Sequence, residues 1–293
     1  MTPPAPGSDP QVLSDYYSAQ YNARADIPDH PEIFAGWANR SAQVRSGPAA
    51  KNARLDVAYG ENAGERLDFF PAPQLGGPLF VFIHGGWWRS LDKSDFSFIV
   101  PGFHERGINV ALTNYTLAPA AAIEDITLQQ VGALAWLYHQ APSLGANRER
   151  IIVSGHSAGG HLAAMLMAAD WPAYSPELPI DLVKGGLVFS GLYDLEMVQH
   201  AAFVRDDLRL TPERVGQLSP ARMTQSHPTP FTTAVGGLES DEFKRQNRLL
   251  RDAWSATHVA DIALPEANHL TICDGLGTPG APLFAAAIAL LGQ

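Results

Sequence analysis

The stretch that decides the fold is Arg150-Ile-Ile-Val-Ser-Gly-His-Ser-Ala-Gly-Gly-His-Leu-Ala-Ala-Met, residues 150–165. Its apolar, β-branched run at 151–153 predicts a buried parallel strand, and residues 162–167 predict the first turns of a helix. The Gly-His-Ser-Ala-Gly between them matches G-x-S-x-G, a turn that holds its central serine in a strained conformation above the sheet. We therefore expect Ser157 to lie at a helix N-terminus, where the helix dipole favours developing negative charge.

The same five residues have an alternative interpretation, a glycine-rich turn around a buried serine. The preceding strand and the small residues at 158–160, 163 and 164 favour the nucleophile turn. A serine hydroxyl is too weakly acidic to attack a carbonyl at neutral pH. Ser157 therefore needs a base from elsewhere in the chain.

The composition is that of one globular domain spanning residues 1–293. Hydrophobic residues make up 46% of the chain and charged residues 17%, with no Pro/Ser/Gly-rich linker to divide it. Residues 1–10 are rich in proline, and we expect them to be disordered. The interrupted helical pattern over about 12–47 predicts a helical segment that packs over the main body.

The net charge of -10 argues against nucleic acid and against an anionic membrane as partners, and it favours a small neutral substrate. The single cysteine, Cys273, cannot form an internal disulfide. The first ten residues lack the features of a signal peptide, and no apolar run reaches the ~18 residues of a membrane span. These observations predict a cytoplasmic protein. They leave its oligomeric state open, and a homodimer is compatible with them.

Strands and helices alternate along most of the chain. An antiparallel hairpin is predicted at 54–59 and 65–70, where polar and apolar residues alternate on both sides of a glycine-containing turn. Further strands are predicted at 79–83, 108–112, 150–154, 186–190, 231–235 and 258–262, and helices at 96–106, 124–140 and 282–290. This order predicts an α/β fold with an about eight-stranded, mostly parallel sheet and helices on both faces.

The segment His84-Gly-Gly-Trp-Trp88 follows the strand at 79–83, and reactive groups gather beyond the carboxyl ends of parallel strands. Consecutive glycines let backbone amides turn toward a ligand, as in the HGGG-type oxyanion hole. We expect the amides of Gly86 and Trp87, with that of Ala158, to form this hole. We expect His84 to brace the loop through a hydrogen bond. The alternative is a tight turn with tryptophans in the core.

The base and its carboxylate are expected after the last two strands. Glu239 follows the strand at 231–235, where a carboxylate can orient the catalytic histidine, although Asp241 and Asp194 remain alternatives. His269 lies 30 residues beyond Glu239 and completes the order serine, acid, histidine. A solvated loop acid and a surface histidine are the non-catalytic interpretations.

Other chemistries lack their motifs. The sequence has no H-E-x-x-H, no Cys/His pair at metal spacing and no G-x-x-x-x-G-K, so we expect no metal and no cofactor. Aromatic and histidine side chains near the predicted site are candidates for the wall of a substrate pocket or for the core. They are Trp88, Tyr193 and His84, together with Tyr21, Phe34 and Trp37 of the N-terminal segment.

Taken together, these residues resemble the α/β-hydrolase fold, and within it the kynurenine formamidase (arylformamidase) group, which borders on the hormone-sensitive-lipase-like esterases. The resemblance extends over about residues 80–275. Its matching pieces are His84-Gly-Gly-Trp-Trp88, Gly155-His-Ser-Ala-Gly-Gly-His161, Ser190-Gly-Leu-Tyr-Asp-Leu195, Leu218-Ser-Pro220, Glu239-Ser-Asp-Glu-Phe-Lys-Arg-Gln246 and Asn268-His269. The Glu-Phe-Lys-Arg-Gln piece points to the formamidase group, in which aspartate is common at the position of Glu239.

The resemblance implies a serine hydrolase that cleaves a small carboxylic ester or amide through an acyl-enzyme on Ser157. An aryl formamide such as N-formylkynurenine is the more specific expectation. A general short-chain carboxylesterase without formamide preference is the alternative. A ligand receptor that keeps the hydrolase fold without turnover is a third interpretation.

Overall fold

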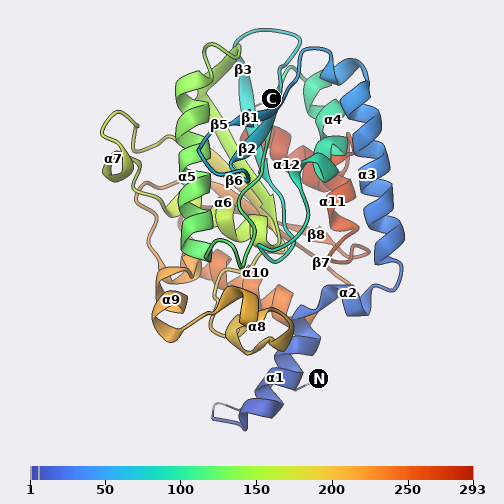
Figure 1. Cartoon of the computed structure of the whole chain (residues 1–293), viewed down its shortest axis with the longest axis vertical. Coiled ribbons are helices and arrows are strands. Elements are labelled where there is room, and N and C mark those ends of the chain that lie inside the picture. Colours follow the sequence, from blue (N-terminus) through green and yellow to red (C-terminus); the bar gives the residue numbers. More distant parts are fainter. Residues whose placement is uncertain (1, 6, 293) are drawn as a thin grey trace.

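The computed structural model describes residues 2–5 and 7–292. A single eight-stranded sheet crosses the molecule in the order β1-β2-β4-β3-β5-β6-β7-β8 (Figure 1). The pairs β1–β2 and β2–β4 are antiparallel, and the remaining pairs are parallel, as the sequence predicted. The strands are β1 Arg54–Ala58, β2 Arg66–Phe70, β3 Gly77–Ile83, β4 Asn109–Thr113, β5 Ala146–His156, β6 Gly185–Phe189, β7 Phe231–Gly236 and β8 His258–Leu264.

Helices cover both faces of the sheet, with α5 and α6 on one face and α3, α4, α11 and α12 on the other (Figure 1). The α-helices are α1 Pro10–Tyr21, α2 Ala23–Asp26, α3 His30–Ser46, α4 Val100–Glu105, α5 Ile123–Gln140, α6 Ala158–Ala168, α7 Trp171–Tyr174, α8 Ala202–Leu208, α9 Pro212–Gln217, α10 Asp241–Ala253, α11 Ile272–Gly277 and α12 Pro282–Leu290. The 3₁₀ turns are η1 Pro48–Ala50, η2 Lys93–Ile99, η3 Val198–His200 and η4 Pro220–Arg222. Within residues 2–5 and 7–292, no helix has both the length and the apolar composition to cross a membrane.

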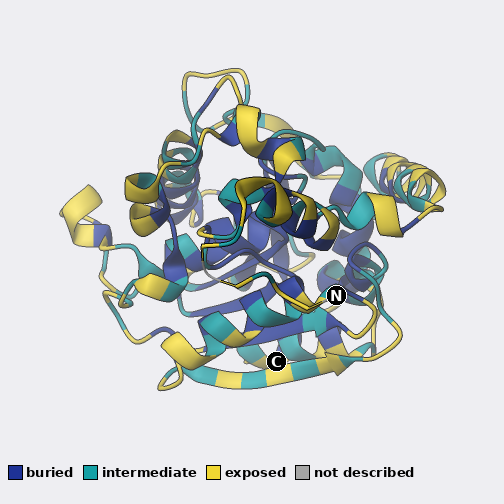
Figure 2. Ribbon diagram, turned by 90° about the horizontal axis from the view of Figure 1, so that it is seen from below, coloured by how far each residue is buried: buried dark blue, intermediate teal, exposed yellow. Residues whose placement is uncertain are grey.

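The core has two halves because successive strand residues point to opposite faces of the sheet. In β3, Val81 and Ile83 join the cluster under α5 and α6, whereas Phe80 and Phe82 join the cluster under α4 and α12. Figure 2 shows the buried strands in the middle and the exposed outer faces of the helices around them. The near-continuous apolar run of β3 follows from burial on both faces.

The segment predicted as one helix at 96–106 differs in the structure. It is the 3₁₀ turn η2, which begins at a capping box of Asp92 and Asp95, followed by the short helix α4. Pro101 lies in the first turn of α4, where its missing N–H group costs nothing and its ring blocks continuation of a preceding helix. Helices α7, α8, α9, α10 and α11 were not predicted from the sequence.

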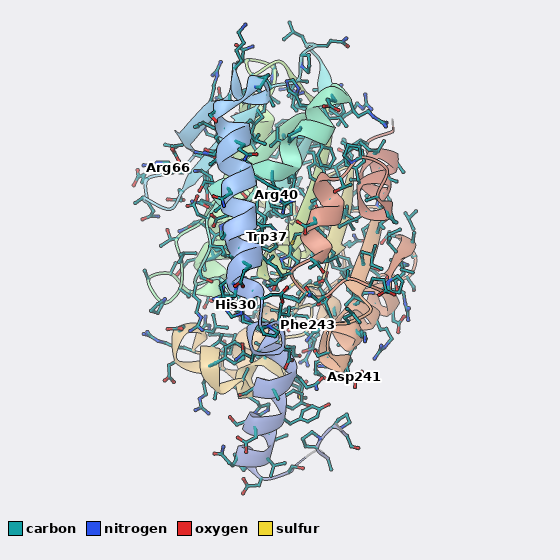
Figure 3. All side chains as sticks on the ribbon, turned by 90° about the vertical axis from the view of Figure 1, so that its right-hand side faces the viewer. His30, Trp37, Arg40, Arg66, Asp241 and Phe243 are labelled. Carbon is teal, nitrogen blue, oxygen red and sulfur yellow. The ribbon has the colours of Figure 1, made fainter. Side chains whose placement is uncertain are left out.

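The N-terminal helices pack along the body of the molecule. Helix α3 packs alongside η2, and its Trp37 is buried against Phe96 and Phe98. Figure 3 shows α3 with His30, Trp37 and Arg40 along its length, and α1 extending beyond the body at one end. The short helix α2 joins them, and this connection brings α2 to the carboxyl end of the sheet.

Candidate active site

Ser157 occupies the sharp turn between β5 and α6. Its φ of 56° and ψ of −121° lie in a region that residues other than glycine rarely adopt. The turn needs glycine on both sides of the serine because α6 lies close to the strands. A Cβ on Gly155 would lie 2.1 Å from the carbonyl oxygen of Gly159, and a Cβ on Gly159 would lie 2.0 Å from the carbonyl oxygen of Ile83. The strained serine is therefore held by backbone contacts on both sides.

Three side chains from separate loops meet at this turn. The Ser157 Oγ lies 3.1 Å from Nε2 of His269, and Nδ1 of His269 lies 2.6 Å from Oε2 of Glu239. With Nδ1–H donating to the carboxylate, Nε2 is left as the acceptor for the serine proton. All three residues are buried, and the ring of Phe243 packs on the imidazole at a centroid distance of 4.2 Å.

Glu239 is held by two further hydrogen bonds. Its Oε1 accepts from the Ser190 hydroxyl at 2.5 Å and from the backbone N–H of Gly236 at 2.7 Å. The two alternative acids lie elsewhere. Asp194 forms an ion pair with Arg222, and Asp241 is exposed in the first turn of α10. Among the described residues, Glu239 is thus the carboxylate bonded to the imidazole.

The loop after β3 presents backbone amides next to the serine. Gly86 has a φ of 100° and Trp87 a φ of 56°, and no acceptor among the described residues binds either amide. The amide of Ala158 is the first of α6, where helical bonding leaves N–H groups free. His84 lies behind this loop, and its Nδ1–H donates to the carbonyl of Gly85 at 2.8 Å. The arrangement can bind an anionic oxygen attached to a carbon at Ser157.

A second histidine, His156, supports the loop that carries His269. Its Nε2–H donates to the backbone carbonyl of His269 at 2.7 Å. Burial and the neighbouring imidazole of His269 keep the pKa of His156 well below its ordinary value. His156 therefore stays neutral and serves as a fixed donor that positions this loop.

The cavity beside Ser157 is small, about 30 Å³, which is room for a group of a few atoms. The N-terminal segment forms much of its wall. Its lining includes Gly86, Trp87 and His269 from the body, and Ala23, Arg24, Phe34 and Trp37 from the N-terminal segment. A second cavity of about 160 Å³ adjoins His269 and is also closed by this segment, through Gln20 and Ile27.

Several residues proposed for the pocket wall do not line the cavity at Ser157. Trp88 is completely buried and packs edge-on against His161. Tyr193 is also completely buried, and its backbone N–H donates to the side chain of Gln246. These two side chains, together with His84, turn into the core because the loops that carry them pack against the body. Tyr21 is likewise buried, whereas Phe34 and Trp37 do line the cavity.

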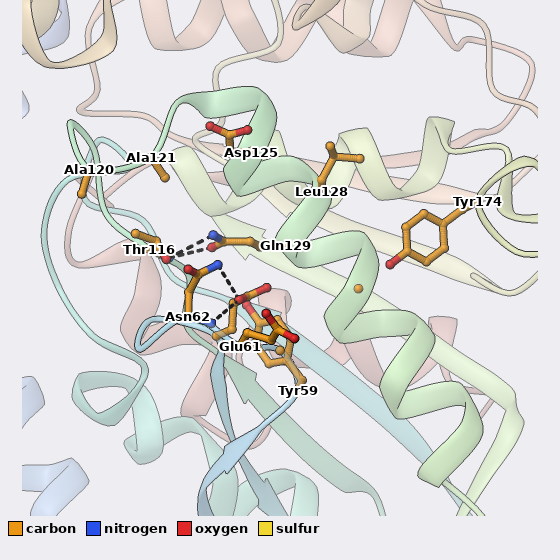
Figure 4. Close-up of a pocket in the computed structure, with 13 residues that line it drawn as sticks. Tyr59, Glu61, Asn62, Thr116, Ala120, Ala121, Asp125, Leu128, Gln129 and Tyr174 are labelled. Atoms are coloured by element: carbon orange, nitrogen blue, oxygen red, sulfur yellow. Dashed lines mark hydrogen bonds between the residues drawn. The ribbon is translucent and has the colours of Figure 1, made fainter.

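A larger cavity lies elsewhere. It measures about 610 Å³, opens widely to solvent and lies between the β1–β2 turn and α5, with Tyr59, Gln129 and Tyr174 in its wall (Figure 4). Its lining includes neither Ser157 nor His269. Among the described residues, no group of three or more His, Cys, Asp and Glu side chains is arranged to hold a metal ion.

Sequence reasoning missed three residues of this site. Ser190 belongs to one of the motifs that carry the resemblance, the position of His156 next to the nucleophile predicts no more than a packing or hydrogen-bonding residue, and nothing in the sequence singles out Arg24. A serine directly after a parallel strand, as Ser190 is after β6, is a usable signal because strand ends meet at one edge of the sheet. Arg24 carries no such signal, since only the folded chain brings α2 to the cavity.

Comparisons with known proteins agree on the type of protein. A family model described as BD-FAE matches residues 67–171. The kynurenine formamidase of Danio rerio is 30% identical over 237 residues, which cover 76% of each chain. The esterase LipQ of Mycobacterium tuberculosis is 24% identical over 86% of this chain and 62% of its own. The crystal structure of a putative thioesterase from Silicibacter sp. has a TM-score of 0.80 and 30% identity, covering 92% of this chain and 97% of that one.

Proposed function

Because this chain belongs to the kynurenine formamidase family of α/β-hydrolases and is a hydrolase, we propose that it cleaves an aryl formamide such as N-formylkynurenine by serine catalysis. The observation that carries this proposal is the contact chain from Ser157 through His269 to Glu239, with distances of 3.1 Å and 2.6 Å. The three side chains have the chemical types and the order of contacts that nucleophilic acyl transfer needs.

In the proposed mechanism, the Ser157 Oγ attacks the carbonyl carbon while Nε2 of His269 takes the hydroxyl proton. The carboxylate of Glu239 stabilises the resulting imidazolium. The amides of Gly86 and Trp87, with that of Ala158, bind the oxyanion of the tetrahedral intermediate. His269 then gives the proton to the leaving amine. A water molecule repeats both steps on the acyl-enzyme and releases the acid.

The size of the cavity supports a small acyl group. Only about 30 Å³ is open beside Ser157, with Trp87, Phe34 and Trp37 in the wall. A formyl or acetyl group fits this space, and the rest of the substrate then extends toward the cavity mouth. A formyl group is the smallest acyl group, and the Danio rerio relative is named a kynurenine formamidase.

Replacement of the nucleophile tests the proposed function. We expect Ser157→Ala to lower kcat/KM for formanilide by at least about 10⁴-fold, since the attacking oxygen is lost while the fold is kept. A fluorophosphonate probe should label the wild-type chain at Ser157 and leave the variant unlabelled. Labelling of the variant, or turnover that survives the substitution, would place the nucleophile elsewhere. A wild-type chain that binds substrates without labelling or turnover would support the receptor interpretation.

A general short-chain carboxylesterase is the second candidate, and the similarity to the esterase LipQ favours it. Esters have better leaving groups than amides, so a generalist should cleave p-nitrophenyl acetate with a much higher kcat/KM than formanilide. A formamidase should prefer the formamide over the corresponding acetamide, because the smaller formyl group is less crowded in a cavity of about 30 Å³. The kcat/KM values for p-nitrophenyl acetate, formanilide and acetanilide, compared with one another, distinguish a general carboxylesterase from a formamidase.

A further inference from the structure

Arg24 brings a positive charge to the cavity at Ser157. It lies in α2, lines the same cavity as Ser157 and His269, and is half-buried. Its Nη2 donates to the Ser90 hydroxyl at 3.0 Å, and its guanidinium carbon lies 5.1 Å from the centre of the Phe34 ring. These two contacts fix the guanidinium and leave most of its N–H donors without an acceptor.

Within residues 2–5 and 7–292, no carboxylate lies within ion-pair distance of Arg24. Arg66 and Arg150 are also half-buried without an ion pair in the described part of the chain, but each of them donates to backbone carbonyl oxygens. The nearby Arg89 pairs with Asp207, so that acid is already engaged by another cation. Burial and repulsion from Arg89 lower the pKa of Arg24, yet arginine remains protonated at neutral pH.

A half-buried guanidinium with free donors is suited to a planar anion. Arginine binds carboxylates through two parallel hydrogen bonds, which give both energy and orientation. The stacking on Phe34 holds the plane of the guanidinium. The acyl group that this cavity can hold is too small to carry an anion, so an anion bound by Arg24 belongs to the leaving group.

We propose that Arg24 is the residue that binds a carboxylate on the leaving group, such as the carboxylate of N-formylkynurenine, and that it thereby determines which formamides or short-chain esters are preferred. This inference rests on the proposed function. The substrate then carries an anionic group, which the net charge of the chain did not predict, because Arg24 places a positive charge in the wall of the cavity at Ser157. Arg24 is thus the residue that determines specificity, while Ser157 and His269 carry out the reaction.

The test compares formanilide with the three formanilides that carry a carboxylate at the ortho, meta or para position of the ring. The carboxylate then lies at three different distances from the scissile bond. We expect the wild-type chain to prefer at least one carboxylate over formanilide. Arg24→Gln should lower kcat/KM for that carboxylate by roughly 10- to 100-fold, mainly through KM, and change formanilide less than about threefold. Arg24→Lys, which keeps the charge without the planar fork, should fall between them.

The matched control is Arg106→Gln, which removes the same charge from an exposed residue before β4, at the opposite end of the sheet. It should behave as the wild type on all four substrates. Equal losses of Arg24→Gln on charged and neutral substrates would overturn the proposal and make Arg24 a structural residue. No preference for any carboxylate in the wild type would overturn it as well.

Binding to Ser157→Ala separates this inference from the proposed function. Calorimetry with the preferred carboxylate should show binding that Arg24→Gln, introduced into the same variant, weakens by a similar factor. If the wild type hydrolyses none of the four compounds, the proposed formamidase function fails. In that case the binding of all three carboxylates to Ser157→Ala is measured with and without Arg24→Gln. Weaker binding of at least one carboxylate in the double variant would still support the carboxylate site. Unchanged binding of all three would overturn that site too.

Discussion

Glu239 is one of three carboxylates that were candidates for the acid behind His269, and in the structure it contacts His269 directly. We expect Glu239→Gln to lower kcat by roughly 10⁴-fold, because the amide cannot stabilise the imidazolium and can hold the ring in the wrong tautomer. Steady-state kinetics on the best substrate measures this loss. The control is Asp241→Asn, which neutralises an exposed acid two residues away and should change kcat less than about twofold. A large loss in the control with activity kept in Glu239→Gln would make Asp241 the acid.

At the scale of elements, the close packing of α6 on the sheet decides whether Ser157 is presented at all. We expect Gly159→Ala to lower the free energy of unfolding by about 3 kcal/mol or more, because its Cβ would lie 2.0 Å from the backbone oxygen of Ile83 and backbone cannot move cheaply. Urea unfolding measures the change. The matched control is Gly132→Ala in α5, where the nearest atom is the Tyr174 hydroxyl at 3.5 Å. That variant should gain about 0.5–1 kcal/mol.

For the whole molecule, buried histidines determine how stability changes with pH. Burial lowers the pKa of His84, of His156 and of His161, the last to about 4. Below pH 6.5 the unfolded chain takes up protons at these residues and the folded chain does not. The free energy of unfolding should therefore fall as the pH decreases from 6.5 toward 4, by about 1.4 kcal/mol per pH unit for each histidine that remains neutral.

Urea unfolding between pH 7 and pH 4 measures this dependence. The matched variant is His161→Gln, whose amide can keep the hydrogen bond that Nε2 of His161 donates to the carbonyl of Leu218. Its free energy of unfolding should fall less steeply than that of the wild type over the same range. Identical slopes in the two proteins would contradict the neutral state of the buried His161.

The parallel sheet could be predicted because burial on both faces leaves a local mark, the apolar runs of β3 and β5 between helical patterns. The hairpin at the edge was recognisable from its alternation. The segment at 96–106 was predicted incorrectly, since a 3₁₀ turn followed by an α-helix keeps the apolar spacing of one helix. Helices such as α8 and α9 are short, and their residues carry too little periodicity to be recognised.

The sequence by itself determined the α/β architecture and predicted the turn at Ser157 and the place of His269, because each depends on local patterns and on the place of a residue after a strand. It left three carboxylates as candidates, and the tertiary structure brings Glu239 to His269. Only the tertiary structure decided that Trp88 and Tyr193 enter the core and that Arg24 reaches the cavity. The physical reason is that the direction of a loop side chain depends on what packs against it. For Trp88 and Tyr193 that neighbour is the body of the molecule, whereas Arg24 reaches the cavity on an N-terminal segment that lies more than a hundred residues before Ser157 in the sequence.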